Sequence, residues 1–515
     1  MDFEVVTGFS SARLHPFPYA VLVIDNWDDW FQFNTMYTLY VVDQGPKRVH
    51  IGSVKIGQFG MKPDQRRPNL PESFETLGPE FFSLGQDDSY YQALNDLGTE
   101  IRDNVLMSLN DVAFADPELF IRASEESVTD ISLLRSVAKS TVTEQFRRIA
   151  RGGARLTRYS FAYRSGTGKR PKISPISLTF DVIPESQPPT NIHVIIGRNG
   201  VGKTHLLNAM TRALVQPPIE TGDNGQFEQL SDGADSPSFV NLVSVTFSAF
   251  DPFEPITSVQ NRKNDVRYSY IGLKRISRSN EEGPLPPKTP QMLSAEFSKS
   301  VKLCRQGARA SRWTRALHSL ESDPIFRDAQ ITNLAPKDED NVSEENAPAA
   351  KVFSLLSSGH KIVLLTITRL VEVVAERSLV LLDEPEAHLH PPLLSAFIRA
   401  LSDLLVDRNG VAVIATHSPV VLQEVPRNCV WKIRRSGSEM VAERPEIETF
   451  GESVGILTRE IFGLEVTESG FHRLIADQVS QIQSYERIVE AFSGELGGEA
   501  KAILRGLIAA SSEEE

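Results

Sequence analysis

The chain has 515 residues, 40% of them hydrophobic, and a formal net charge of −13 at pH 7. This length predicts roughly three domains, and the acidic balance argues against a protein whose whole surface binds nucleic acid. Two cysteines exclude a disulfide framework, and no apolar run reaches the length of a membrane span or resembles a signal peptide, so we expect a cytoplasmic protein without a membrane partner.

Three regions follow one another along the chain. Residues 1–150 are predicted to form an α+β domain of unknown role, because strand patterns at 36–42 and 48–57 precede helical spacing over 88–150. Residues 151–446 are predicted to form an α/β head with a helical insert at about 285–330. Residues 447–515 are predicted to form a C-terminal helical region. Within the head, the polar, acidic stretches 216–238 and 335–350 indicate surface loops or linkers.

The stretch GRNGVGKT at 197–204 indicates a phosphate-binding loop. It fits the pattern G-x-x-x-x-G-K-[ST], follows an apolar strand and precedes a helical segment, which is the context this motif requires. Glycines let backbone N–H groups face phosphate oxygens, and the start of the helix adds positive charge. ATP and Mg²⁺ are the expected cofactors, with Lys203 on the β- and γ-phosphates and Thr204 on the metal. The predicted nucleotide-binding residues here are Gly197, Asn199, Gly200, Gly202, Lys203 and Thr204.

Two later strands end in residues suited to phosphoryl transfer. The segment LVLLDEPEAHLHP at 379–391 is an apolar strand that ends in Asp383 and Glu384. We predict that Asp383 holds Mg²⁺ from its outer coordination sphere and that Glu384 acts as general base on the attacking water. The segment VAVIATHSP at 411–419 repeats this design, and we predict that His417 hydrogen-bonds the γ-phosphate.

The order of four motifs resembles a known family. A phosphate loop, LSSGH at 356–360, LLDE and ATHS follow one another as in the ABC-type ATPase heads of the SMC and RecF class. DEPEAHLHP and THSP look like the AAA-type members of bacterial antiphage systems such as Septu, PARIS and OLD, and 448–472 is similar to the Septu-type ATPase. Over about 155–435, this resemblance implies a P-loop NTPase fold with an ABC-type ATPase head that hydrolyses ATP.

The sequence departs from the family pattern at two motifs. The signature is usually L-S-G-G-Q, whereas here Ser358 replaces a glycine and His360 replaces the glutamine. A clear glutamine loop is also missing, and VTFSAFDPF at 245–253 occupies its place, with Ser248 or Asp251 as candidate replacements.

The LSSGH motif has two interpretations. Ser357 is a suitable helix cap, for which one serine is enough. The resemblance implies instead that Ser357 and Gly359 contact the γ-phosphate bound to the opposite protomer, with a hydroxyl and an unobstructed backbone. The second interpretation predicts a homodimer or higher homo-oligomer formed through the ATPase heads.

The resemblance implies a nucleotide-gated switch in a bacterial defence complex that controls a separate nuclease or toxin effector. A RecF- or SMC-like ATPase of DNA repair or chromosome maintenance is the alternative. DNA or RNA is a candidate partner because residues 147–172 contain nine lysines and arginines and no acid, and such a run can neutralise phosphates. Pairing of these residues with acids of the same chain is the competing interpretation.

Overall fold

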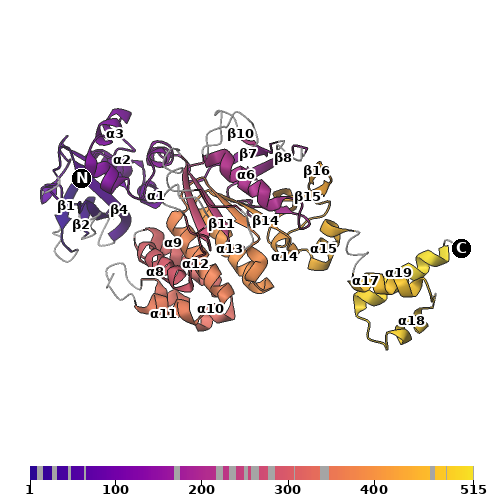
Figure 1. Ribbon diagram of the computed structural model, residues 1–515. Helices are drawn as coiled ribbons and strands as arrows, with labels where there is room; N and C mark the ends of the chain where they lie inside the picture. The colour runs from indigo at the N-terminus through magenta and orange to yellow at the C-terminus, as the bar shows by residue number, and fades with distance from the viewer. Residues whose placement is uncertain are drawn as a thin grey trace.

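The protein is described from a computed structural model (Figure 1). The described residues are 1–8, 16–25, 32–43, 48–62, 65–166, 174–215, 224–230, 239–248, 253–256, 266–276, 285–306, 308–336, 347–463, 470–482 and 484–513.

The N-terminal region folds around its own mixed sheet. Its strands are β1 (Asp2–Val6), β2 (Tyr19–Ile24), β3 (Met36–Val42), β4 (Arg48–Gln58), β5 (Ser73–Phe74) and β6 (Phe81–Gly85), in the order β5-β1-β2-β3-β4-β6. Its helical segments are α1 (Asp88–Asp96), α2 (Thr99–Ser108), α3 (Pro117–Ala123), η2 (Thr129–Leu133), α4 (Lys139–Thr141), η3 (Val142–Phe146) and α5 (Arg147–Ala150). One buried cluster joins strands and helices, so this region has a hydrophobic core of its own.

The head is built on a second sheet, whose strand order is β12-β11-β13-β14-β9-β15-β16. The strands are β9 (Ile192–Ile196), β11 (Asn241–Thr246), β12 (Arg267–Gly272), β13 (Ser378–Asp383), β14 (Val411–Thr416), β15 (Val430–Ser436) and β16 (Glu439–Glu443). All neighbours pair in parallel except β15 and β16. Parallel strands buried on both faces consist of continuous apolar runs, as in VAVIAT of β14, where every residue is buried.

One face of this sheet is covered by α6 (Lys203–Val215) and by a small antiparallel sheet of β7 (Tyr159–Arg164), β8 (Ser177–Val182) and β10 (Gln226–Gln229), in the order β10-β7-β8. The buried side chains of these elements form one cluster with the central strands. The stretch 216–238 was predicted to be a loop, and that prediction is wrong for β10. Its four residues pair with β7 through the backbone, which polar side chains such as those of Gln226 do not prevent.

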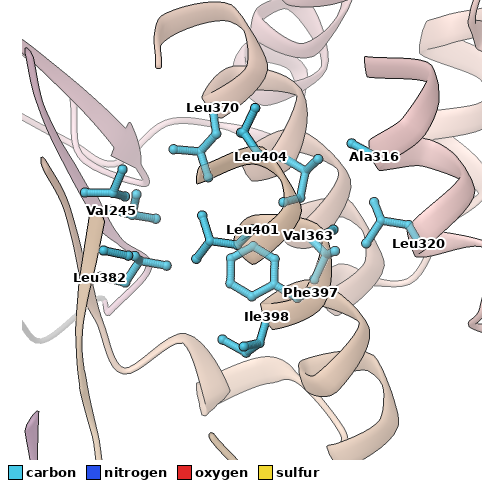
Figure 2. Close-up of a cluster of buried hydrophobic side chains, with 14 of the residues drawn as sticks. Val245, Ala316, Leu320, Val363, Leu370, Leu382, Phe397, Ile398, Leu401 and Leu404 are labelled. Carbon is cyan, nitrogen blue, oxygen red and sulfur yellow. The ribbon is translucent and has the colours of Figure 1, made fainter. Parts of the chain in front are cut away.

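The other face carries the larger helical layer. It comprises α8 (Pro290–Cys304), α9 (Ala308–Leu320), α10 (Pro324–Asp328), η4 (Ile331–Leu334), α11 (Ala347–Leu355), α12 (Ser358–Val373), η5 (Pro385–His388), α13 (Pro391–Asp407), α14 (Pro419–Leu422) and η6 (Arg427–Cys429). Figure 2 shows Val245 and Leu382 of the sheet side by side with Phe397 and Leu401 of α13 in the shared core. The helices of the predicted insert are present, but the predicted linker 335–350 overlaps the start of α11.

Together, a parallel sheet between helical layers and a phosphate loop after β9 make the head a P-loop NTPase domain. The predicted α/β fold class is confirmed. Beyond the head lie α15 (Val454–Phe462), α17 (Gly470–Val479), α18 (Tyr485–Ala491) and α19 (Gly498–Glu513), and the last three lie apart from the head, at the opposite end from the N-terminal region (Figure 1). A separate small cluster of buried side chains holds them together. Among the described helices, none has the length and apolar character needed to cross a membrane.

A buried network of charges joins the N-terminal region to the head. Asp87 caps α1 and lies 3.0 Å from Arg312 of α9, and its neighbour Asp88 contacts Arg408 directly after α13. Arg155 bridges the two regions, with Nε 2.7 Å from Asp88 and Nη2 3.0 Å from Asp407. Burial opposes ionisation of Asp87, but the guanidinium groups of Arg312 and Arg408 hold its pKa well below the ordinary value.

This network changes the interpretation of the basic run. Arg148 pairs with Glu376 at 2.6 Å, and Arg155 pairs with Asp88 and Asp407. Arg147 and Arg151 donate hydrogen bonds to the carbonyls of Ala115 and Phe114. The competing interpretation, pairing within the chain, therefore holds for Arg148 and Arg155, and all four arginines make contacts inside the protein. Residues 167–172 of the run lie outside the described residues.

Candidate nucleotide site

Polar residues from separate motifs meet at one edge of the head sheet. Thr416 of β14 is in register with Ile196 of β9, and Asp383 of β13 is in register with Ala415 of β14 and with Thr246 of β11. Since these strands are parallel, the residues that follow them emerge at the same edge, where ligands bind in open α/β sheets. Gly197, Glu384, His417 and the segment 247–248 therefore share one location.

The loop 197–204 has the backbone of a phosphate cradle. Gly200 and Gly202 adopt φ angles of 82° and 105°, which side chains rarely tolerate. Gly197 is required for a different reason, because a Cβ there would lie 2.4 Å from the carbonyl oxygen of Ile433 in β15. Asn199 and Gly200 are exposed at the tip, so backbone N–H groups of the loop are accessible to a ligand.

Lys203 is buried at the base of this loop, with 5% of its surface exposed. Its Nζ donates to the carbonyl oxygens of Gly197 and Arg198, at 2.9 and 3.1 Å. Burial lowers the pKa of Lys203, while Glu384 and Asp383 favour the charged form. The ammonium thus lies within electrostatic reach of both carboxylates, and phosphate oxygens can replace the two carbonyls as its acceptors.

The residues present fit Mg²⁺ beside a nucleotide. Thr204 stands in the first turn of α6 directly after Lys203, and Asp383 ends the neighbouring buried strand β13. A hydroxyl and a carboxylate are the hard oxygen donors that this ion prefers. Thr204 would bind the ion directly and Asp383 would hold it through the outer coordination sphere.

Glu384 is placed by an uncommon backbone conformation. Its φ angle is 45°, in the left-handed region, and its N–H donates to the carbonyl oxygen of Ala415 at 2.8 Å. The turn breaks the strand after Asp383, and one third of the Glu384 side chain is exposed. A strained conformation at a functional position is an accepted sign of pre-organisation, and here it leaves the predicted base accessible to water.

His417 lies between two carboxylates. Its Nδ1 is 3.8 Å from Glu384 and 3.2 Å from Glu386, and Glu386 also accepts a hydrogen bond from the His417 backbone N–H. Glu386 was missed in the sequence because its spacing from His417 carries no motif. The available signal was an acid two residues after the predicted base, in the short turn η5 that Glu384 precedes.

The LSSGH motif lies on the helical side of this edge. Ser357 is the N-cap of α12, and its side chain accepts a hydrogen bond from the N–H of His360. Gly359 packs so closely that an added Cβ would lie 2.5 Å from the carbonyl oxygen of His388 in η5. The cap interpretation therefore describes Ser357 in the single chain, and the contact to a second protomer stays a prediction.

The resemblance predicts a glutamine in the signature and another in a separate glutamine loop, and this chain has other residues at both places. His360 is 3% exposed and bonds inward to Asp323, so it does not present a side chain to a second protomer as a surface glutamine would. Ser248 follows β11 at the nucleotide edge and remains a candidate to replace the glutamine of the glutamine loop. Asp251 lies outside the described residues.

Comparison with known proteins identifies a matching family model and a relative of similar length. A family model described as "AAA domain, putative AbiEii toxin, Type IV TA system" matches residues 305–423, which contain LSSGH, LLDE and ATHS. Protein ea59 of Escherichia phage lambda is 41% identical over 505 residues, which cover 95% of this chain and 94% of the phage protein.

Two solved structures are similar to part of this chain. The ADP conformation of an ATP-binding cassette of an ABC transporter is 12% identical, with a TM-score of 0.31 over 61% of this chain and 100% of that chain. The SMC head domain from Thermotoga maritima is 13% identical, with a TM-score of 0.29 over 56% of this chain and 100% of that chain. The fold assignment depends on strand order and the phosphate loop, not on these scores.

Proposed function

The chain belongs to the family of protein ea59 of Escherichia phage lambda, and from the site in its ATPase head we propose that it binds and hydrolyses ATP as a nucleotide-gated switch. One observation carries this proposal. Lys203 in the phosphate loop, Glu384 after β13 and His417 after β14 come from three separate motifs and meet within electrostatic or hydrogen-bonding reach at one sheet edge.

Each residue has a role that follows from its position. Lys203 exchanges its loop carbonyls for phosphate oxygens, and the backbone around Gly200 and Gly202 supplies N–H donors. Mg²⁺, when bound through Thr204 and Asp383, neutralises phosphate charge. Glu384 accepts a proton from the attacking water, and His417 donates to the γ-phosphate while Glu386 fixes its ring.

We further propose that two heads close on ATP, with Ser357 and Gly359 of one protomer facing the γ-phosphate bound to the other. In support, α12 is a helix of 16 residues, and the free N–H groups and the helix dipole at its N-terminus favour an anion. Ser358 is exposed next to the cap, so the helix end is accessible from outside the chain.

The closed dimer would control a separate nuclease or toxin effector in a bacterial defence complex. The description of the matching family names a toxin–antitoxin system, which supports this context. Any sensing of DNA or RNA would use surfaces other than Arg148 and Arg155, since both are paired with acids across the domain junction.

Trapping the ATP-bound state tests this function. Glu384→Gln keeps the side chain's shape and removes its basicity, so we expect ATP binding to persist and turnover to fall by about 10²–10⁴. Dimers of the variant should accumulate with ATP in size-exclusion chromatography with light scattering. The matched control is Glu439→Gln, on the exposed edge strand β16, which should hydrolyse ATP like the wild type. Unchanged turnover in Glu384→Gln would reject the assignment.

A further inference from the structure

Three side chains form a hydrogen-bonded chain at the start of α12. The hydroxyl of Ser357 lies 2.6 Å from Nδ1 of His360, and Nε2 of the same ring lies 3.1 Å from Asp323. His360 and Asp323 are both buried, with side chains 4% and 2% exposed. Asp323 comes from the insert, where it caps α10, so the chain links the signature motif to a segment 37 residues away in sequence.

The surroundings fix the orientation of the ring. The phenyl ring of Phe326 meets His360 edge to face, with centroids 4.9 Å apart at 78°. Asp323 Oδ1 also accepts the backbone N–H groups of Ile325 and Phe326, so this carboxylate oxygen acts as an acceptor. Nε2 of His360 must therefore carry a hydrogen.

The proton on Nε2 determines what Ser357 can do. In a neutral imidazole only one nitrogen carries hydrogen, so Nδ1 accepts and the Ser357 hydroxyl donates to it. A γ-phosphate offers only acceptors, and in this state Ser357 has no hydrogen left for it. If Nδ1 takes up a proton, the ring donates to Ser357 Oγ and the hydroxyl hydrogen is released for the phosphate.

We propose that His360 is a positioning residue of the signature, which takes up a proton at Nδ1 when the heads close and thereby turns the Ser357 hydroxyl toward the partner's γ-phosphate. This inference rests on the proposed function and specifies its signature contact. The proton comes from solvent and returns there on opening, and no covalent bond is made or broken. Asp323 supplies the counter-charge for the imidazolium.

The helix end makes this uptake depend on the nucleotide. His360 lies in the first turn of α12, where the positive end of the helix opposes a further positive charge. An arriving γ-phosphate offsets that opposition. Another titratable group near this carboxylate is His390, which precedes α13, is half exposed, and has Nε2 3.7 Å from Asp323 Oδ2. Its ring centroid is 6.1 Å from that of His360.

Proton counting tests the proposal. In the Glu384→Gln background, which traps closed dimers, a pH-indicator dye in weak buffer reports protons bound when Mg–ATP is added. We expect about one more proton per closed site than in Glu384→Gln with His360→Gln, in which an amide N–H takes the place of the protonated ring. Asp323→Asn keeps the cap of α10 and should also lose this proton, which provides a second test if His360→Gln does not dimerise.

His390→Gln is the matched control, because it removes the other histidine beside the same carboxylate. It should keep the full proton count. Equal counts with and without His360, in dimers verified by light scattering, would overturn the inference and leave the ATPase function standing. A loss seen in His390→Gln alone would assign the proton to His390 and would likewise overturn it. Failure of the Glu384→Gln chain to dimerise with ATP would remove the proposed function, and the inference with it.

Discussion

Glu386 holds His417 through two groups at once. One carboxylate oxygen of Glu386 accepts the backbone N–H of His417 at 2.8 Å and lies 3.2 Å from Nδ1 of its ring. The Glu386 side chain is 8% exposed, whereas His417 is 44% exposed, so a buried anion orients an accessible imidazole. With Nδ1 this close to Glu386, Nε2 is the ring atom left to face a phosphate.

Replacing Glu386 with glutamine should weaken hydrolysis and spare binding. The amide retains an oxygen for the backbone N–H of His417 but no longer stabilises a protonated ring. We expect turnover to fall about 10- to 100-fold, by analogy with the loss of partners that orient metal-binding histidines. Initial rates of phosphate release at saturating ATP measure this loss.

Two controls separate positioning from general damage. Glu424→Gln removes another partly buried carboxylate, which pairs with Arg399 at 2.8 Å, and should leave turnover unchanged. Combining Glu386→Gln with His417→Ala should cost little more than His417→Ala alone, because the glutamate acts through the histidine. Additive losses would contradict the assignment.

The parts of the site that the sequence predicts are those encoded in contiguous motifs at strand ends. Lys203, Asp383, Glu384 and His417 each follow an apolar strand, and the parallel sheet brings these ends together. Asp323 could not be found in this way, because its partner His360 is 37 residues away and the two meet only after α10 packs against α12.

The basic run 147–172 shows the same limit, because its partners are also distant in sequence. Its lack of acids between 147 and 172 suggested a free positive surface. Asp88, Glu376 and Asp407, which pair with Arg148 and Arg155, come from distant parts of the chain. The strands β11 and β12 were also not predicted, since polar residues such as Ser244 and Ser269 interrupt their apolar patterns.

The junction between the N-terminal region and the head should depend on Arg408. Its side chain is 7% exposed and contacts both Asp88 and Asp87, so Arg408→Met leaves the buried Asp88 and the partly buried Asp87 with fewer partners. Removing one member of a buried ion pair typically costs about 3–5 kcal/mol. We therefore expect a clear drop in Tm and faster proteolysis near residues 151–158. Arg315→Ala, which removes a 62% exposed partner of Asp407, should cost less than about 1 kcal/mol. Equal effects of the two changes would argue against a junction stabilised by buried charge.

Asp111 predicts a pH dependence of the N-terminal region. This buried carboxyl accepts the hydroxyl of Tyr91 and the N–H of Ala113, but burial raises its pKa from 3.8 to about 7. Because the folded state binds this proton more tightly than the unfolded state, the contribution of Asp111 to stability is greatest below pH 4. It is lost as the pH rises to about 7, by roughly 4 kcal/mol for this shift.

Asp111→Asn should remove that loss while keeping an acceptor oxygen. Native-state hydrogen exchange over residues 81–113 measures the local free energy of opening. We expect the difference between wild type and variant to change steadily from pH 5 to 7 and to level off above. A difference that stays constant over this range would show that Asp111 does not titrate there.

The last prediction concerns whether Ser357 acts on the neighbouring protomer. Ser357→Arg should leave ATP binding to single chains nearly intact, since Lys203 and Thr204 are untouched. It should block closure and hydrolysis, because a bulky cation replaces the hydroxyl that caps α12. Lys203→Ala should instead abolish ATP binding, because the loop loses the ammonium that is held at its base.

Mixing the two variants provides the decisive case. In the heterodimer, one composite site joins an intact phosphate loop to an intact signature, and the other site carries both lesions. If the sites act independently, ATPase activity should recover to about half of wild type, since one of two composite sites is whole. Heterodimers purified through two different tags, with each variant shown to be folded, are the required material. No recovery in them would count against independent sites in trans, and full activity of the Ser357→Arg homodimer would reduce Ser357 to a helix cap.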